Sequence, residues 1–211
     1  MKNYTRSALI VIDMERGFID KESAHCIAGA AATVPACIRA TEIARSKGIP
    51  VIFVKRHYRA DGSDVECTRY AAWVKGGKSM RPDTEGAEEP IGLAPREGDY
   101  ALIKPRWSAF FGTELDLILR RLGVRRVILA GTTTPNCIRT TCYDANSLDY
   151  NVVILTDCTS SQTEEIQRVN LADMERMGAV LMDTDAFEDY DEHTIPDLAA
   201  GILAEMENYV E

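Results

Sequence analysis

The chain has 211 residues, of which 45% are hydrophobic and 27% charged, a composition typical of a globular domain. Its formal net charge of −9 argues against nucleic acid or an anionic membrane as a partner. No apolar run approaches the ~20 residues needed to span a bilayer. The first residues lead into a predicted strand without a signal-peptide pattern. We therefore expect a cytoplasmic protein with one domain over residues 1–211.

Apolar runs that alternate with helical patterns predict an α/β fold. The first run, residues 7–13, is continuously apolar, as in a strand that helices cover on both faces. Strands are predicted at residues 7–13, 50–54, 100–104, 126–130, 151–155 and 179–182, and helices at 33–47, 113–122, 136–148 and 164–177. This order predicts a three-layer, doubly wound, six-stranded parallel sheet of the Rossmann-like kind.

The remaining segments are less regular. Residues 14–32 are predicted to form a loop, and residues 56–98 are rich in glycine, proline and charge, with a short helical piece near residues 67–73. A loop this long within a compact domain is typical of a functional cover or a partner surface. From about residue 184 the chain is an acidic tail, with a helix predicted at residues 197–209.

Polar residues stand at the carboxyl ends of three predicted strands. Asp13 ends the first, Lys104 ends the third, and Cys137 follows the fourth. Ligands of doubly wound sheets bind outside these strand ends. Each residue alone has a structural alternative, respectively a turn cap, a solvated charge and a small core residue. Their convergence on one edge of the sheet nevertheless indicates an active site.

Cys137 is the candidate nucleophile. With Thr134 as helix N-cap, Pro135 falls at the first helical position and Cys137 at the third. Unpaired N–H groups and the helix dipole at that position are expected to lower the thiol pKa. The chain has six cysteines but no Cys-x-x-Cys pair, so zinc ribbons and thioredoxin-like motifs are not expected.

These residues lie in motifs that resemble the isochorismatase-like cysteine hydrolase superfamily. The motifs are Val-Ile-Asp-Met around Asp13, Ile-Lys-Pro-Arg-Trp-Ser-Ala-Phe from Lys104, and Gly-Thr-Thr-Thr-Pro-Asn-Cys-Ile-Arg-Thr-Thr around Cys137. The superfamily includes nicotinamidases, N-carbamoylsarcosine amidases, ureidoacrylate hydrolases and maleamate amidases. The resemblance extends over residues 7–182 and implies an Asp–Lys–Cys triad. It also implies a cis peptide bond between Thr132 and Thr133.

The resemblance further implies a hydrolase that cleaves the C–N bond of a small amide or N-carbamoyl compound. Asp13 would accept the thiol proton, and Cys137 would form a thioester while ammonia or an amine leaves. The backbone N–H groups of Thr133 and Cys137 would hold the oxyanion. The residues around the cysteine look most like those of the N-carbamoyl amidases.

The motif that binds a metal in nicotinamidases differs in this chain. Nicotinamidases carry Asp-x-His at the end of the second strand and a further histidine in the next loop. Here the corresponding residues are Lys55, Arg56 and His57, and the next histidine is His193. Lysine cannot replace a carboxylate ligand. We therefore predict no metal and no cofactor, and nicotinamidase activity is not expected.

Residues near these motifs are candidates for substrate binding. The predicted contacts are Phe18, His57, Trp107, Phe110 and Thr134. Arginines at 56, 59 and 106 are candidates for pairing with a substrate carboxylate. The structural alternatives are core packing for the aromatic residues and solvated surface positions for the arginines.

Three other interpretations remain open. One is isochorismatase-type vinyl ether hydrolysis, which needs no thiol. Another is a non-catalytic binding or assembly module on the same fold. The third is a redox-sensing thiol protein, with Cys142 as a poorly placed partner for Cys137. The resemblance also suggests a homo-oligomer, a dimer or tetramer, in which a residue such as Trp73 completes a neighbouring subunit's pocket.

Overall fold

The computed structural model describes residues 6–192, 195 and 197–207. Its centre is a parallel sheet of six strands in the order β3-β2-β1-β4-β5-β6, which confirms the predicted fold class. The strands are β1 (Ser7–Ile12), β2 (Val51–Lys55), β3 (Tyr100–Ile103), β4 (Arg126–Thr132), β5 (Asn151–Ser160) and β6 (Val180–Met182).

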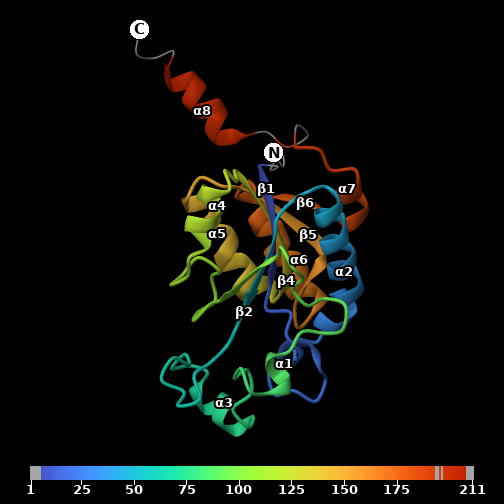
Figure 1. Ribbon diagram of the computed structural model, residues 1–211, viewed down its shortest axis with the longest axis vertical. Helices are drawn as coiled ribbons and strands as arrows, with labels where there is room; N and C mark the ends of the chain where they lie inside the picture. The colour runs from blue at the N-terminus through green and yellow to red at the C-terminus, as the bar shows by residue number, and fades with distance from the viewer. Residues whose placement is uncertain (1–5, 193–194, 196, 208–211) are drawn as a thin grey trace.

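Helices cover both faces of this sheet (Figure 1). Successive side chains of a strand point to opposite faces, so Ile10 and Ile12 enter one apolar cluster while Leu9 and Val11 enter the other. The first cluster is closed by α4 (Leu115–Arg121), α5 (Arg139–Ser147) and α6 (Glu164–Arg176), and the second by α2 (Ala30–Ser46) and α7 (Thr184–Glu188). Continuous apolar strands are therefore what this three-layer packing requires.

Several element boundaries differ from the prediction. The segment 14–32 is not wholly a loop, because it contains α1 (Arg16–Ile19) and the start of α2 at Ala30. Strand β5 continues to Ser160, because a register shift lets its last residues pair with the end of β4. This continuation matters for the site, since it places Ser160 beside the turn that carries Cys137.

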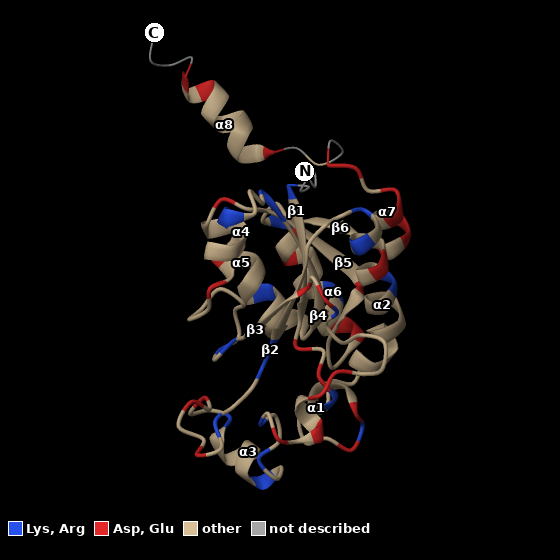
Figure 2. Ribbon diagram, viewed as in Figure 1, with Lys and Arg blue, Asp and Glu red and all other residues tan. Residues whose placement is uncertain are grey.

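Most of the irregular segment 56–98 forms a small lobe below the carboxyl ends of the strands, and its last residues return past α2 to the amino end of β3 (Figure 1). It contains α3 (Tyr70–Lys75) and the short helical turn η1 (Glu85–Ala87), and it carries charges of both signs (Figure 2). Trp73 is fully buried at the centre of the lobe's own apolar cluster, and its Nε1 donates to Ser79 O at 2.7 Å. The expectation that Trp73 completes a neighbour's pocket is therefore wrong.

The C-terminal helix α8 (Leu198–Glu207) projects from the end of the molecule opposite the lobe (Figure 1). Its predicted last residues, 208 and 209, lie outside the described residues. Among the residues that the structure describes, no helix is both long and apolar enough to cross a membrane.

Gly131 in β4 determines how closely β4 approaches β1. Its φ is +113°, and an added Cβ would lie 2.0 Å from Ile12 O. We predict that Gly131→Ala lowers the free energy of unfolding by about 3 kcal/mol or more, because backbone atoms of β1 must move. Urea denaturation followed by circular dichroism measures the loss.

Gly123→Ala is the matched control for this substitution. Gly123 also has a positive φ, +71°, but an added Cβ there meets no atom within 4 Å. Its replacement should cost about 1 kcal/mol, from backbone conformation alone. Equal losses for the two variants would contradict the close approach of β4 to β1.

Candidate active site

The structure brings Asp13, Lys104 and Cys137 together at the carboxyl edge of the sheet. Lys104 Nζ lies 2.7 Å from Asp13 Oδ2 and 3.7 Å from Cys137 Sγ, and it also donates to Arg106 O at 3.0 Å. The three residues are 1%, 0% and 3% exposed, respectively. The ammonium group thus joins the carboxylate and the thiol in one buried cluster.

Backbone hydrogen bonds at the strand ends position the two charged residues. Asp13 follows β1 with a φ of 51°, and its N–H donates to Val54 O on β2. Lys104 follows β3, and its N–H donates to Lys55 O at the end of β2. The ends of three adjacent strands are thereby fixed side by side, although β2 separates β1 from β3.

Cys137 lies in η2 (Thr134–Ile138), a π-helical turn between β4 and α5. The prediction that Thr134 is the N-cap is wrong, because Thr133 occupies that position and makes no side-chain cap hydrogen bond. The hydroxyls of Thr133 and Thr134 instead donate to Ser160 O, at 3.1 and 3.0 Å. The peptide bond between Thr132 and Thr133 is cis. Contacts with β5, rather than a helix cap, therefore position the turn.

The pKa of the Cys137 thiol is raised to about 11, mainly by burial and then by the negative charge of Asp13. Lys104 and Arg56 act in the opposite direction, but their charges do not reverse the shift. The expectation that the start of the helix lowers this pKa is therefore wrong, because desolvation outweighs the favourable charges. A thiol with this pKa is protonated at neutral pH in the resting protein.

A second buried ion pair lies beside the thiol. Arg56 Nη1 donates to Glu66, whose other oxygen accepts a hydrogen bond from Tyr58 OH at 2.6 Å. Arg56 Nη2 lies 3.9 Å from Cys137 Sγ, and Arg56 and Glu66 are 0% and 4% exposed. Burial alone would raise the pKa of Glu66, but the charge of Arg56 holds it below its usual value. Sequence reasoning missed Glu66, which lies in the segment without periodic pattern.

Glu15 is a third buried carboxyl group at this edge. It is 1% exposed, and its Oε1 accepts a hydrogen bond from Arg56 N at 2.5 Å. Burial, and then the charge of Asp13, raises the pKa of Glu15 well above its usual value. Burial at this edge therefore favours the neutral, protonated form of Glu15.

Only some of the residues predicted to contact a substrate lie at the carboxyl edge of the sheet. Phe18 packs in the lobe's apolar cluster, and Trp107 is partly buried against the sheet. Thr134 is fully buried, and its hydroxyl is used in holding the turn. The ring of Phe110 stacks on Tyr150 at 5.9 Å, toward the amino end of β5 and away from Cys137. Phe110 is thus a packing residue in this structure.

Three further predicted residues, His57, Arg59 and Arg106, lie in the lobe or at its border. Burial and the charge of Lys55 lower the pKa of His57, which favours the neutral imidazole. Arg59 is exposed and pairs with Asp61 in a turn. Arg106 Nη1 donates to Asp64 O at 2.6 Å and so ties the lobe to the residues after β3. Of the three arginines proposed from sequence, Arg56 is the one that contacts Cys137.

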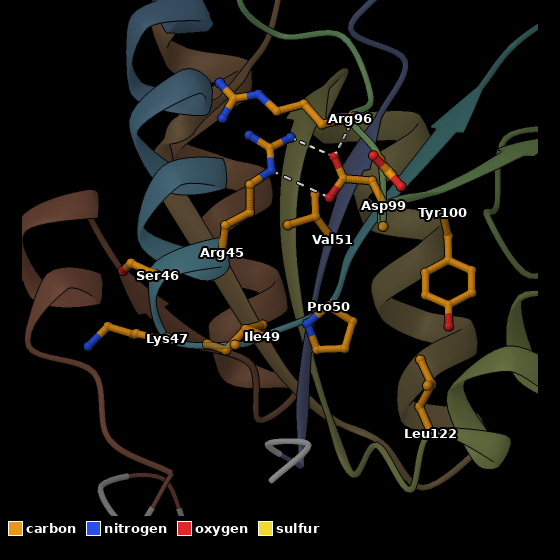
Figure 3. A pocket seen from close by; sticks show the side chains of 13 residues that line it. Arg45, Ser46, Lys47, Ile49, Pro50, Val51, Arg96, Asp99, Tyr100 and Leu122 are labelled. Carbon is orange, nitrogen blue, oxygen red and sulfur yellow. Dashed lines mark hydrogen bonds and ion pairs between the residues drawn. The ribbon is translucent and has the colours of Figure 1, made fainter. Parts of the chain in front are cut away.

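A pocket of about 690 Å³ lies at the opposite edge of the sheet, at the amino ends of β2 and β3 (Figure 3). Arg45 and Asp99 form an ion pair in its lining, with Nη2 and Oδ2 2.6 Å apart. None of the predicted site residues lines this pocket. Within the part of the chain that the structure describes, no group of three or more His, Cys, Asp or Glu side chains is arranged to hold a metal ion.

The isochorismatase domain family matches residues 7–186, and the chain therefore belongs to that family. An Arabidopsis thaliana relative named probable inactive nicotinamidase is 41% identical over 84% of this chain and 92% of its own. Ureidoacrylate amidohydrolase of Azorhizobium caulinodans is 30% identical over 80% of this chain and 83% of its own. The crystal structure of an isochorismatase family protein from Desulfovibrio vulgaris has a TM-score of 0.84 and 42% identity, covering 87% and 97% of the chains.

The raised pKa of Cys137 predicts how its alkylation depends on pH. Because the folded pKa is about 11, the rate with iodoacetamide should rise about tenfold per pH unit from pH 7 to 10 without levelling. Free cysteine, measured in parallel, should level off above its pKa of ~8.5. Peptide mass spectrometry gives the rate at Cys137. A plateau below pH 8 would show that the thiolate is stable in the resting protein and would contradict this result.

Proposed function

We propose that this protein is a cysteine-dependent hydrolase that cleaves the C–N bond of a small amide or N-carbamoyl compound through a thioester. The observation that carries the proposal is the position of Lys104, whose ammonium group contacts both Asp13 and Cys137 in a buried cluster. Family membership supports it, since the family includes a protein named ureidoacrylate amidohydrolase. A ureido group is an N-carbamoyl amine, so that name fits the proposed substrate class.

In the first half of the reaction Asp13 acts as general base. Asp13 takes the proton of the Cys137 thiol, and the thiolate attacks the carbonyl carbon of the substrate. Lys104 stabilises the thiolate as it forms, because its positive charge lies 3.7 Å from the sulfur. The negative charge then moves to the carbonyl oxygen. We assign the backbone N–H groups of Thr133 and Cys137 as its donors.

The second half of the reaction reverses the role of Asp13. The protonated carboxyl group gives its proton to the leaving nitrogen, the C–N bond breaks, and an acyl or carbamoyl thioester remains on Cys137. Water then attacks the thioester carbon while Asp13 removes its proton. The C–S bond breaks, the acid leaves, and the proton returns from Asp13 to the sulfur.

A non-catalytic binding protein is the second candidate function. Two observations favour it: Cys137 is only 3% exposed, and a 41% identical relative carries the name probable inactive nicotinamidase. Vinyl ether hydrolysis is a weaker alternative, because it gives no role to a thiol placed beside a carboxylate and an ammonium group.

Replacement of the nucleophile tests the proposal. Ammonia release is measured with a panel of small amides and ureido compounds, and isochorismate is included as a vinyl ether. We expect Cys137→Ala and Cys137→Ser to lower kcat/KM by about 10³-fold or more with any amide that is hydrolysed. Cys67→Ser is the matched control, because Cys67 is exposed, and it should keep full activity. An active Cys137→Ala variant would exclude the mechanism.

Asp13→Asn separates proton transfer from thiol acidity. Removing the carboxylate charge should lower the Cys137 pKa, so alkylation by iodoacetamide at pH 8 should become faster, by about tenfold per unit of pKa. Hydrolysis should nevertheless fall by about 10³-fold or more, because no base takes the thiol proton. Near-ultraviolet circular dichroism checks the fold, since Lys104 loses its buried partner. Slower alkylation together with normal hydrolysis would contradict the role of Asp13.

A further inference from the structure

Arg56 is held firmly along one edge of its guanidinium group. Nη1 donates to Glu66 and lies 3.4 Å from Tyr58 OH, and the Arg56 carbon Cζ lies 5.9 Å from the centre of the Tyr58 ring. Glu66 is itself fixed by the Tyr58 hydroxyl. The orientation of the guanidinium plane is therefore set before any ligand binds.

The opposite edge of the same guanidinium group lacks such partners. Arg56 Nε is buried and has no hydrogen-bond acceptor among the residues that the structure describes. Nη2, which lies on the same edge as Nε, has a contact of 3.9 Å with Cys137 Sγ. A buried donor without an acceptor is destabilising. Its presence beside the nucleophile indicates that a ligand supplies the missing acceptor.

We propose that the Nε–Nη2 edge of Arg56 binds a carboxylate of the substrate. The substrates would then be amides or N-carbamoyl compounds that carry a carboxylate close to the scissile carbonyl group. This inference rests on the proposed hydrolase function and assigns a substrate class to the same site. Parallel N–H groups on one edge of arginine match the two oxygens of a carboxylate, which lysine cannot reproduce.

The geometry limits how far the carboxylate can stand from the reacting carbon. A bound carboxylate oxygen lies ~2.8 Å from Nη2, and the attacked carbon must lie ~3–3.5 Å from the sulfur. Because Nη2 and Sγ are only 3.9 Å apart, one short molecule can place a carboxylate on Arg56 and its carbonyl carbon at the sulfur. Glu66 fits this role as a positioning residue, because it orients the guanidinium group without occupying the edge that faces the thiol.

A pair of alkylating reagents tests the carboxylate site without hydrolysis. Iodoacetate and iodoacetamide transfer groups of similar size to a thiolate, but only iodoacetate carries a carboxylate. Both react with the same thiolate, so the ratio of their rates is independent of the thiol pKa. At pH 9 we expect the rate with iodoacetate divided by the rate with iodoacetamide to be about tenfold higher at Cys137 than at the exposed Cys67 of the same molecule.

Substitutions of Arg56 should remove this preference. Arg56→Gln, and the double variant Arg56→Gln with Glu66→Gln, should bring the ratio at Cys137 to within about twofold of that at Cys67. The double variant removes both partners, so it avoids a buried unpaired Glu66 if the single variant fails to fold. Arg59→Gln is the matched control, because Arg59 is exposed and pairs with Asp61, and it should leave the ratio unchanged.

Three results would overturn the carboxylate site. They are an equal ratio at the two cysteines, a high ratio that persists in both Arg56 variants, and labelling of Cys67 without labelling of Cys137 by iodoacetate. These results leave the hydrolase proposal intact, because ammonia release from uncharged amides reports on hydrolysis separately. Conversely, a high ratio with no ammonia release would retain the anion site and reject the hydrolase.

Discussion

The contact between Lys104 Nζ and Asp13 Oδ2 is the interaction on which the rest of the site depends. Both side chains are almost fully buried, and neither charge is tolerated there without the other. The sheet makes the contact possible, because the carboxyl ends of β1, β2 and β3 are fixed beside one another by backbone hydrogen bonds. Cys137 joins this pair through Lys104, so the thiol shares a cluster that is already held in place.

The lobe within residues 56–98 adds buried contacts at this edge of the sheet. It supplies Glu66 to pair with Arg56, and Arg106 ties its backbone to the residues after β3. Burial raises the pKa of Cys137 and so keeps the resting thiol protonated. In the proposed mechanism, a reactive thiolate forms only when Asp13 takes the proton. The same burial that lowers the resting reactivity of the thiol strengthens its interaction with Lys104 during attack.

Much of the framework could be predicted from sequence for a physical reason. Continuous apolar runs such as residues 7–12 can be satisfied only between two helix layers, and the carboxyl ends of parallel strands meet at one edge. Asp13 and Lys104 could therefore be placed together although they are far apart in the chain.

Properties that depend on tertiary contacts could not be predicted. Any of three consecutive threonines can cap a helix, and only the position of Ser160 shows that Thr133 and Thr134 are used to hold the turn. The thiol pKa depends on burial in the folded chain, which a local helix-dipole argument omits. Glu66 becomes recognisable only once folding places it against Arg56, since residues 56–98 have no periodic pattern.

The central claim is that Cys137 carries the substrate's acyl or carbamoyl group during turnover. The most direct measurement is rapid acid quenching of the protein with a small amide or ureido acid that it hydrolyses, followed by intact-mass and peptide mass spectrometry. We expect a mass increase equal to the acyl or carbamoyl group, located on Cys137 and absent from Cys137→Ser handled identically. Ammonia release with full activity in Cys137→Ser, or an adduct on another residue, would contradict the account.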